Sequence, residues 1–175
     1  MVALATKQPE DLCRRLLTSF GGIRCGQIVA DWYLWELVLN ERRDLKAIVE
    51  IGTWEGGFSR YLKAQADARG MDFRTYDAVV PEVPPPGFER LDVFAYPLAV
   101  AEFFHGREPL ALLCDGGNKP RELKTFSELL EAGSVVVAHD WMTETMPADV
   151  PDSLRPVYEA CCDRLGSMSR VFEVV

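Results

Sequence analysis

Five carboxylate side chains end or follow short apolar runs of the sequence: Glu50, Asp77, Asp92, Asp115 and Asp140. Carboxylates in such positions can bind an ammonium group, the hydroxyls of a sugar or a divalent cation. Acids scattered over a solvated surface would not follow apolar runs so regularly. We therefore interpret these residues as parts of a binding site.

The sharpest signal is a glycine-rich stretch that follows an apolar run and begins at Glu50. Gly52 comes directly after the run, where a Cβ would crowd a ligand, and Gly56 and Gly57 open a helix that approaches both ligand and sheet. No G-K-[ST] follows, so the stretch is not a P-loop, and Trp54 replaces the second glycine of a dinucleotide-binding turn. Glu50 would repel a phosphate but suits a cationic ligand such as the amino group of a sulfonium amino acid. The alternative is a glycine-rich turn without a ligand.

Two further acids, Asp115 and Asp140, end the fourth and fifth predicted strands beside other oxygen and nitrogen donors. Neighbouring parallel strands bring such residues to one edge of a sheet. Two carboxylates with an oxygen or nitrogen donor from Asn118 or His139 make a site for a divalent ion such as Mg²⁺, which would chelate a substrate hydroxyl and lower its pKa. His139 could instead act as a base or hydrogen-bond within its loop, and Asp115 could cap the turn that follows it. The predicted metal ligands are Asp115, His139 and Asp140.

Apolar runs alternate with amphipathic segments from residue 45 onward, a pattern typical of a parallel sheet covered by helices on both faces. The proline-rich segment 79–88 is a predicted loop, because proline cannot continue a helix interior or a central strand. We predict strands over 47–51, 73–77, 91–94, 109–114, 134–138 and 169–175. The first predicted helix of this part follows the glycine-rich stretch and ends at about residue 68. Further helices are predicted over 97–104, 120–132 and 152–165.

The length of 175 residues fits a single domain, 1–175. Residues 1–44 are predicted to form N-terminal helices over 9–20 and 27–41, and residues 45–175 a Rossmann-like core. The aromatic side chains of the second helix could line a pocket, but core packing is the better interpretation.

The formal net charge of −8 argues against a nucleic-acid ligand, because proteins that grip a phosphate backbone present a basic face. Five cysteines without a C-x-x-C pair predict reduced thiols rather than a disulfide framework or a zinc site. The first ten residues lack the basic and apolar parts of a signal peptide, and no apolar stretch reaches the roughly 18 residues of a membrane span. We expect a cytoplasmic protein with a small-molecule substrate, bound to neither nucleic acid nor membrane.

The pattern E-x-G-x-x-x-G-G-x-S, which begins at Glu50, resembles motif I of class I S-adenosylmethionine (SAM)-dependent methyltransferases. It is closest to the catechol O-methyltransferase-like and cephalosporin-hydroxylase-like families. The resemblance implies a Rossmann-like three-layer α/β fold with Glu50 and Gly52 near the methionine moiety, Asp77 on the ribose hydroxyls and Asp92 beside adenine. Asp77 alone could equally cap a helix or hold a turn. The implied SAM site comprises Glu50, Gly52, Thr53, Gly56, Gly57, Ser59, Asp77, Asp92 and Asp115.

The ends of the fourth and fifth strands are similar to those of metal-dependent small-molecule O-methyltransferases. In that family an acid follows strand four, and an acid pair or Asp-Asn follows strand five. Here Asp140 is flanked by His139 and Trp141 instead of a second acid. Lys119 stands near the position where related enzymes keep a lysine as general base. The resemblance therefore implies Lys119 as a catalytic residue, although it could also be a solvated residue at a helix start. His139, which could act as a base, is the second catalytic candidate.

The methyltransferase class ends in a hairpin of strands six and seven, whereas only one terminal strand, 170–175, is evident from this sequence. Either the sheet lacks a strand or a partner completes its edge. Because an unpaired edge invites association, we expect a homodimer.

The expected function is methyl transfer from SAM to a hydroxyl of a small molecule such as a sugar or phenol, with Mg²⁺ as a second cofactor. One alternative is a non-catalytic member of the fold that binds the cofactor or a protein partner. The other is a nicotinamide-dependent dehydrogenase, against which Trp54 and the missing G-x-G-x-x-G argue.

Overall fold

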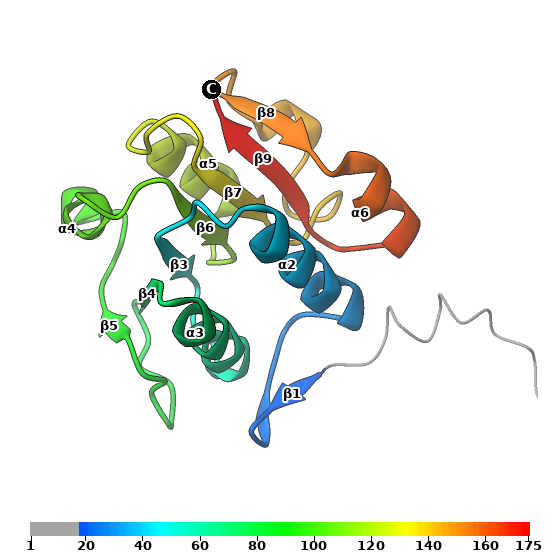
Figure 1. Ribbon diagram of the computed structural model, residues 1–175. Coiled ribbons are helices and arrows are strands. Elements are labelled where there is room, and N and C mark those ends of the chain that lie inside the picture. The colour runs from blue at the N-terminus through cyan, green and yellow to red at the C-terminus, as the bar shows by residue number, and fades with distance from the viewer. Residues whose placement is uncertain (1–17) are drawn as a thin grey trace, which may run out of the picture.

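The structure, a computed structural model, describes residues 18–175 and is built around a central sheet (Figure 1). Its strands are β1 Ser19–Phe20, β2 Ile23–Arg24, β3 Ala47–Ile51, β4 Asp72–Asp77, β5 Phe88–Arg90, β6 Leu110–Cys114, β7 Val135–Ala138, β8 Leu154–Val157 and β9 Arg170–Val174. Its helices are α2 Val29–Glu41, α3 Gly57–Arg69, α4 Pro97–Phe104, α5 Lys119–Ser127 and α6 Glu159–Leu165, with a short 3₁₀ turn, η1, at Pro147–Asp149. β1 and β2 form a small hairpin, and the other seven strands form the central sheet.

The central sheet has the strand order β5-β4-β3-β6-β7-β9-β8. The first five strands in this order are parallel, and β9 is antiparallel to both of its neighbours. The chain leaves β3 towards β4 and later returns to β6 on the other side of β3. Ligands of such sheets bind beyond the carboxyl ends of the strands at this reversal. The topology therefore places a binding site at the ends of β3 and β6.

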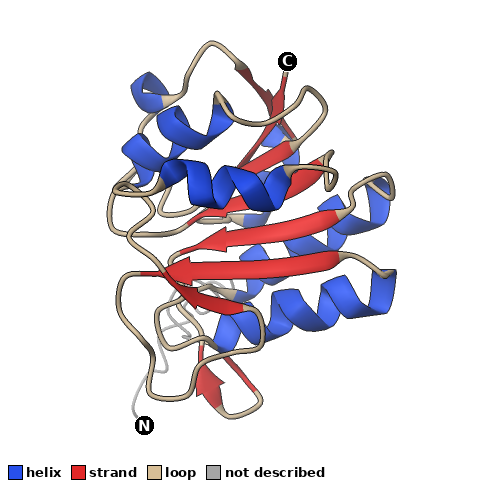
Figure 2. Ribbon diagram, turned by 90° about the vertical axis from the view of Figure 1, so that its left-hand side faces the viewer, coloured by secondary structure: helices blue, strands red, loops and turns tan. Residues whose placement is uncertain are grey.

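Helices cover both faces of the sheet (Figure 2). The core on one face joins alternate strand residues to α2, α3 and α6, and the core on the other face joins the remaining strand residues to α4 and α5. On β6, Leu113 faces the first core and Leu112 the second. β3 and β6 are buried along their whole length, as expected for parallel strands covered on both faces. The predicted three-layer α/β fold is confirmed.

The predicted third strand, 91–94, is wrong by a few residues. The strand next to β4 is β5, Phe88–Arg90, which begins at the end of the proline-rich loop. Residues 92–95 form a turn instead, because the Asp92 carboxylate accepts hydrogen bonds from the Phe94 and Ala95 amides. An aspartate that binds the backbone ahead of it competes with strand pairing.

The predicted helix over 152–165 is also wrong in its first half. Residues 154–157 form β8, which pairs antiparallel with β9, and only 159–165 are helical. Pro156 explains the difference, because proline is excluded from a helix interior but is tolerated on an edge strand. The sheet therefore has its terminal hairpin, and the prediction of an incomplete strand pair is corrected. The homodimer stays a prediction, but this argument for it is removed.

The N-terminal predictions fall partly outside the described residues. The helix expected over 9–20 lies outside them except at its end, where Ser19 and Phe20 form β1. The helix expected over 27–41 is α2, which starts at Val29. The division of a single domain into 1–44 and 45–175 stays a prediction.

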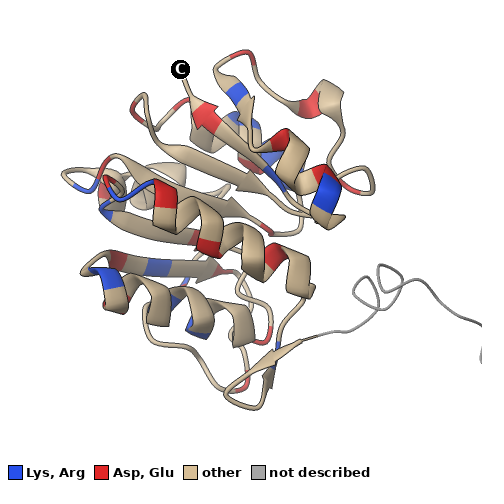
Figure 3. Cartoon of the chain, turned by 45° about the vertical axis from the view of Figure 1, so that its right-hand side comes forward, with Lys and Arg blue, Asp and Glu red and all other residues tan. Residues whose placement is uncertain are grey.

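Four cysteines lie in the described part of the chain and all are free thiols: Cys25, Cys114, Cys161 and Cys162. The fifth, Cys13, lies outside it. None of the helices between residues 18 and 175 has the length and apolar character that a membrane span requires. Figure 3 shows basic and acidic positions interspersed along the helices and loops.

Candidate functional site

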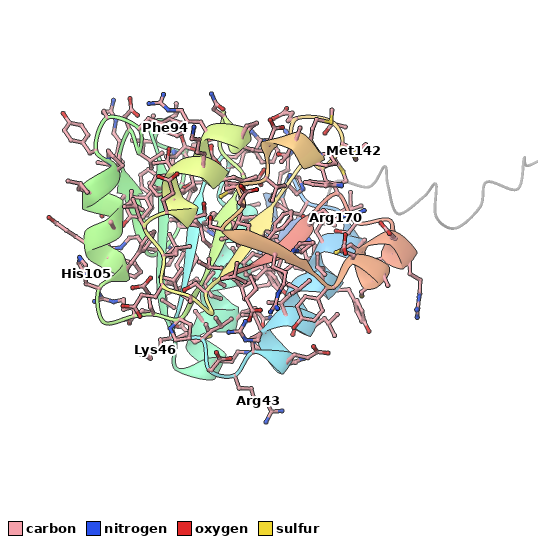
Figure 4. The ribbon with its side chains drawn as sticks, turned by 90° about the horizontal axis from the view of Figure 1, so that it is seen from above. Arg43, Lys46, Phe94, His105, Met142 and Arg170 are labelled. Carbon is pink, nitrogen blue, oxygen red and sulfur yellow. The ribbon has the colours of Figure 1, made fainter. Side chains whose placement is uncertain are left out.

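The parallel strands end at one edge of the sheet, which lies along the upper side of Figure 4. Phe94, after β5, and Met142, after β7, lie at this edge, on the opposite side of the molecule from Lys46, which precedes β3. Asp77 is the last residue of β4, and Asp115 directly follows β6. The acids predicted from the sequence therefore gather at the carboxyl edge.

Two cavities lie along this edge and share Gly52. The larger, of about 400 Å³, lies at the ends of β3, β6 and β7, and the smaller, of about 140 Å³, at the ends of β4 and β5. Polar residues of the larger cavity include Gln27, Glu50, Asp115, Lys119, His139 and Asp140. The smaller cavity is lined among others by Tyr76, Asp77, Leu91, Asp92, Phe94 and Glu122.

The turn after β3 packs on the turn after β6, and Gly52 is the contact point. Its φ is +96°, and a Cβ there would lie 2.2 Å from the carbonyl oxygen of Asp115. Its amide donates to the carbonyl of Tyr76 at 2.9 Å. Only glycine combines this backbone conformation with such a close approach. The sequence-based interpretation of Gly52 as a crowded position therefore agrees with the structure.

Asp77 and Asp92 both line the smaller cavity, and both are held by backbone amides. Asp77 accepts hydrogen bonds from the amides of Trp54 at 3.1 Å and Val79 at 2.9 Å. These bonds tie the end of β4 to the turn after β3. Asp92 is held in its own turn by the amides of residues 94 and 95. The two carboxylates are thus positioned before any ligand binds.

Glu50 is a buried acid in the floor of the larger cavity. The hydroxyl of Thr75 donates to its carboxylate at 2.6 Å, and the hydroxyl of Thr53 lies 2.6 Å from that of Thr75. Burial raises the pKa of Glu50 to about 8, against the opposing effect of the Ser59 and Thr75 hydroxyls. A cation in the cavity would favour the ionised form of this acid.

The other glycines of the predicted cofactor motif have structural contacts. A Cβ on Gly57 would lie 2.3 Å from the carbonyl oxygen of Arg24, so this glycine lets the segment after β2 pack on α3. Gly57 also lines the larger cavity, whereas Gly56 faces the ring of Pro85. Ser59 is buried below Glu50 and lines neither cavity. The contacts of Gly56, Gly57 and Ser59 with a ligand stay predictions.

Asp115, His139 and Asp140 form one cluster at the ends of β6 and β7. A single donor atom from each lies within 4.8 Å of the others. His139 Nδ1 lies 3.0 Å from Asp115 Oδ1 and 3.4 Å from Asp140 Oδ1. The ring is buried, and neither nitrogen has a hydrogen-bond partner of good geometry among residues 18–175. The structure thus brings together the three residues predicted as metal ligands.

The charges of this cluster are strongly coupled. Burial lowers the pKa of His139, but the surrounding carboxylates, Asp115 first, outweigh it and raise that pKa to about 12. The pKa of Asp140 is held well below its usual range, mainly by His139 and also by Lys119. These carboxylates therefore favour the protonated form of the His139 ring when no cation is bound.

Lys119, the first residue of α5, lies beside this cluster. Its Nζ lies 2.8 Å from Glu144 Oε2, 3.0 Å from Asp140 Oδ2 and 3.7 Å from Asp115 Oδ1. Burial lowers its pKa, but hydrogen bonds to Glu144 and Asp140 and the nearby carboxylates raise it well above the usual value. Lys119 is thus a buried ammonium with three acidic neighbours, and the solvated alternative is wrong. Its role as a general base stays a prediction.

Comparison with solved structures identifies the fold. A structure of CmcI with Mg-SAM matches over 100% of this chain and 88% of its own, with 16% identity and a TM-score of 0.64. A structure of CmcI with SAH matches over 89% and 81%, with 18% identity and a TM-score of 0.63. A CmcI apo-structure matches over 90% and 76%, with 15% identity and a TM-score of 0.60. This chain has the class I methyltransferase fold.

No protein-family model matches the chain, and no curated protein matches it by sequence. The likeness is therefore one of structure. Within this fold, β3 with its glycine turn is the first strand of the core, and β8 with β9 is the terminal hairpin that the sequence prediction had missed.

Sequence reasoning missed Asp31 and Gln27, which approach the cluster from the N-terminal part of the chain. Asp31 is fully buried at the start of α2, and Gln27 Nε2 donates to Asp115 Oδ2. The available signal for Asp31 was an acid on the apolar face of a predicted helix, in line with Trp35 and Val38. Such an acid is costly to bury unless it has partners.

Two glutamates near the β6–α5 turn were also missed. Glu144 pairs with Lys119, and Glu122 accepts hydrogen bonds from the amides of Gly116 and Asn118 at 3.1 and 3.2 Å. Burial raises the pKa of Glu122 to about 7 against these bonds. Its role is to hold the turn that carries Asp115.

Proposed function

We propose that the chain transfers a methyl group from SAM to a hydroxyl of a small molecule, assisted by a divalent cation. The observation that carries this proposal is the junction of two cavities at Gly52, with Asp77 in one and an acid-histidine cluster in the other. A ligand with a sugar at one end and a charged amino acid at the other fits these two joined cavities. The CmcI structures with SAH and with Mg-SAM support this interpretation.

In this proposal the nucleoside part of SAM occupies the smaller cavity and the methionine part the larger. Asp77 would accept hydrogen bonds from ribose hydroxyls, as carboxylates at this position of related sheets do. Glu50 would supply negative charge below the ammonium and sulfonium groups, because a bound cation favours its ionised form. Gly52 lines both cavities and has no room for a side chain, because a Cβ there would meet the carbonyl of Asp115.

The acid-histidine cluster fits a divalent cation. Two carboxylates and a buried nitrogen without a hydrogen-bond partner offer three donor atoms in one place: Asp115, His139 and Asp140. A bound divalent cation would lower the pKa of a substrate hydroxyl and orient its oxygen towards the methyl group. The chain's own residues position the reactants and exclude water, which is the main requirement of a direct displacement.

Lys119 supplies a fixed positive charge beside this cluster. Its ammonium neutralises part of the charge of Asp140 and Glu144, to which it is paired. A lysine so held keeps its proton and so favours a negatively charged substrate oxygen at the adjacent position. Lys119 could accept a proton in the reaction only if the divalent cation bound these carboxylates and so removed the ion pairs that hold the proton on its ammonium group.

The complete terminal hairpin removes one reason for the non-catalytic alternative. A scaffold that binds cofactor without turnover remains the outcome to be distinguished by assay. Retained cofactor without methyl transfer to any hydroxylated metabolite, in Mg²⁺ or another divalent ion, would favour that alternative.

Calorimetric titration with SAH, in Mg²⁺ and in chelator, tests the cofactor site. We expect micromolar binding by the wild type and at least about tenfold weaker binding by Asp77→Ala, equivalent to about 1.4 kcal/mol. Asp77→Asn, which keeps an acceptor for the turn amides, should also bind more weakly. Asp67→Ala, an exposed acid near the far end of α3, serves as the matched control. No binding of SAH to folded wild type would overturn the proposal.

A further inference from the structure

His139 has a carboxylate on each side of its ring. Nδ1 faces the Oδ1 atoms of Asp115 and Asp140 at 3.0 and 3.4 Å, and Nε2 lies 3.6 Å from Asp31 Oδ2. Asp31 and His139 are both buried, at 0% and 4% exposure. The two nitrogens of the imidazole thus have distinct surroundings, an acid pair in the cavity and one acid in the protein interior.

Asp31 is held in place from two elements that are far apart in the sequence. Its Oδ2 accepts a hydrogen bond from the Ile28 amide at 3.1 Å, and its Oδ1 accepts one from the Ser167 hydroxyl at 2.6 Å. Ser167 follows α6, which lies beside α2 in Figure 1. A carboxylate at the start of a helix is also favoured by the helix dipole. Asp31 therefore presents a fixed negative charge to Nε2.

The second oxygens of the two cavity acids are already engaged. Gln27 donates to Asp115 Oδ2, and Lys119 lies 3.0 Å from Asp140 Oδ2. The Oδ1 atoms are left facing His139 Nδ1. Adjacent donor atoms around an octahedral ion with bonds of about 2.1 Å lie about 3 Å apart, close to the separations found here. The separations of Nδ1 from the two Oδ1 atoms therefore suit neighbouring positions in one coordination shell.

We propose that this site binds a first-row transition ion, of the class of Mn²⁺ or Co²⁺, in preference to Mg²⁺, and that Asp31 is the positioning residue that turns Nδ1 of His139 into it. The reason is the donor set, because imidazole nitrogen favours transition ions whereas Mg²⁺ is bound almost entirely by oxygen. Asp31 lies 3.6 Å from Nε2 on the far side of the ring, the place that the acid of a carboxylate–histidine–metal arrangement takes, and from there it would orient the ring and strengthen the ligand. This inference rests on the cation of the proposed function and not on its SAM site.

Apart from the His139 ring itself, Lys119 is the one basic side chain among the described residues that lies within ion-pair distance of Asp115 and Asp140. Its Nζ lies 3.7 Å from Asp115 Oδ1, farther than from its partners Asp140 Oδ2 and Glu144. The ammonium therefore sits beside His139 and the two Oδ1 atoms and does not replace the ion.

The donor set is tested by titrating purified protein with Co²⁺ and with Mg²⁺ in wild type and in His139→Asp. Replacing imidazole with a third carboxylate should lower the ratio of Co²⁺ to Mg²⁺ affinity at least about tenfold. Pulsed electron paramagnetic resonance of bound Mn²⁺ should show nitrogen coupling in wild type and lose it in His139→Asp. His105→Asp, which changes the only other histidine of the chain, is the matched control.

Three outcomes would overturn the donor set. They are an unchanged affinity ratio in His139→Asp, an absence of nitrogen coupling in wild type, and a sulfur-to-cobalt absorption band, which would instead identify the cavity thiol of Cys25 as a ligand. Binding of SAH in chelator is measured on the same samples. It reports the cofactor site separately, so failure of the SAM proposal and failure of this one are distinguishable.

Asp31 is tested with Asp31→Asn, which keeps an oxygen acceptor for the Ile28 amide. We expect Co²⁺ binding about 10- to 100-fold weaker than in wild type. In the His139→Asp background the same substitution should have little further effect, because no imidazole is left to position. An equal loss in both backgrounds would show that Asp31 acts only through the fold, and no loss in wild type would show that it does not act on the site.

Discussion

Gly52 illustrates how much a single atom can decide at the edge of this sheet. Its missing Cβ lets the turn after β3 touch the turn after β6, and this contact defines the junction of the two cavities. Asp92, at the same edge of the sheet, depends less on close packing, because its carboxylate is held by an amide of its own turn. Ligand binding at this edge therefore depends on how closely the two turns pack as well as on the chemical groups of their side chains.

Gly52→Ala should destabilise the fold by more than the roughly 1–2 kcal/mol that a positive φ alone costs, and should abolish SAH binding. The matched control is Gly133→Ala, since Gly133 has a φ of +87° but no atom within 4 Å of an added Cβ. Urea denaturation measures the cost of each change. Equal costs for the two variants would show that the contact with Asp115 relaxes easily.

At the scale of elements, β8 completes the sheet through one buried side chain. Leu154 is 5% exposed and packs in the core shared with α4 and α5, whereas Arg155 is exposed and pairs with Glu173. Pro156 places no amide on the outer edge, which discourages pairing with a second chain. The hairpin of β8 and β9 therefore ends the sheet without requiring a partner.

Leu154→Ala should lower the free energy of unfolding by about 2–4 kcal/mol, because it leaves a cavity in the core. Arg155→Ala, next to it on the same strand, should cost less than about 1 kcal/mol, because its ion pair is solvated. Denaturant titration of both variants measures the difference. Similar costs at the two positions would contradict the assignment of this segment to an edge strand.

At the scale of the whole molecule, buried acids link stability to pH. Burial raises the pKa of Glu50 to about 8 from 4.5, so between these values the folded protein holds a proton that the unfolded chain has lost. Stability from this group is therefore present below pH 4.5 and is lost as the pH rises through 8. Glu122, with its pKa raised to about 7, acts in the same direction.

Glu50→Gln should flatten the fall in unfolding free energy between pH 6 and pH 8.5, by up to about 1.4 kcal/mol per pH unit for the one proton involved. Chemical denaturation of wild type and variant across this range gives the two slopes, and Glu122 contributes equally to both. The exposed Glu82→Gln should keep the wild-type slope. An unchanged slope in Glu50→Gln would mean that Glu50 is ionised in the folded protein.

The sequence by itself determined the parallel core and most of the carboxyl edge. The strand 47–51, the helix 97–104 and the acids that follow apolar runs could be predicted because they depend on local patterns, namely hydrophobic period, proline and glycine. The rule that ligands bind beyond strand ends then placed Asp77, Asp115 and Asp140 together before their contacts were known.

Only the tertiary structure decided which side chains complete the site. Asp31 meets Ser167 across 136 residues and Gln27 meets Asp115 across 88, contacts that no local pattern encodes. Residues 154–157 form a strand by pairing with β9, a partner that their local sequence does not reveal, although Pro156 already argues against a helix there. Long-range packing, which overrides local preference, is the physical reason for both results.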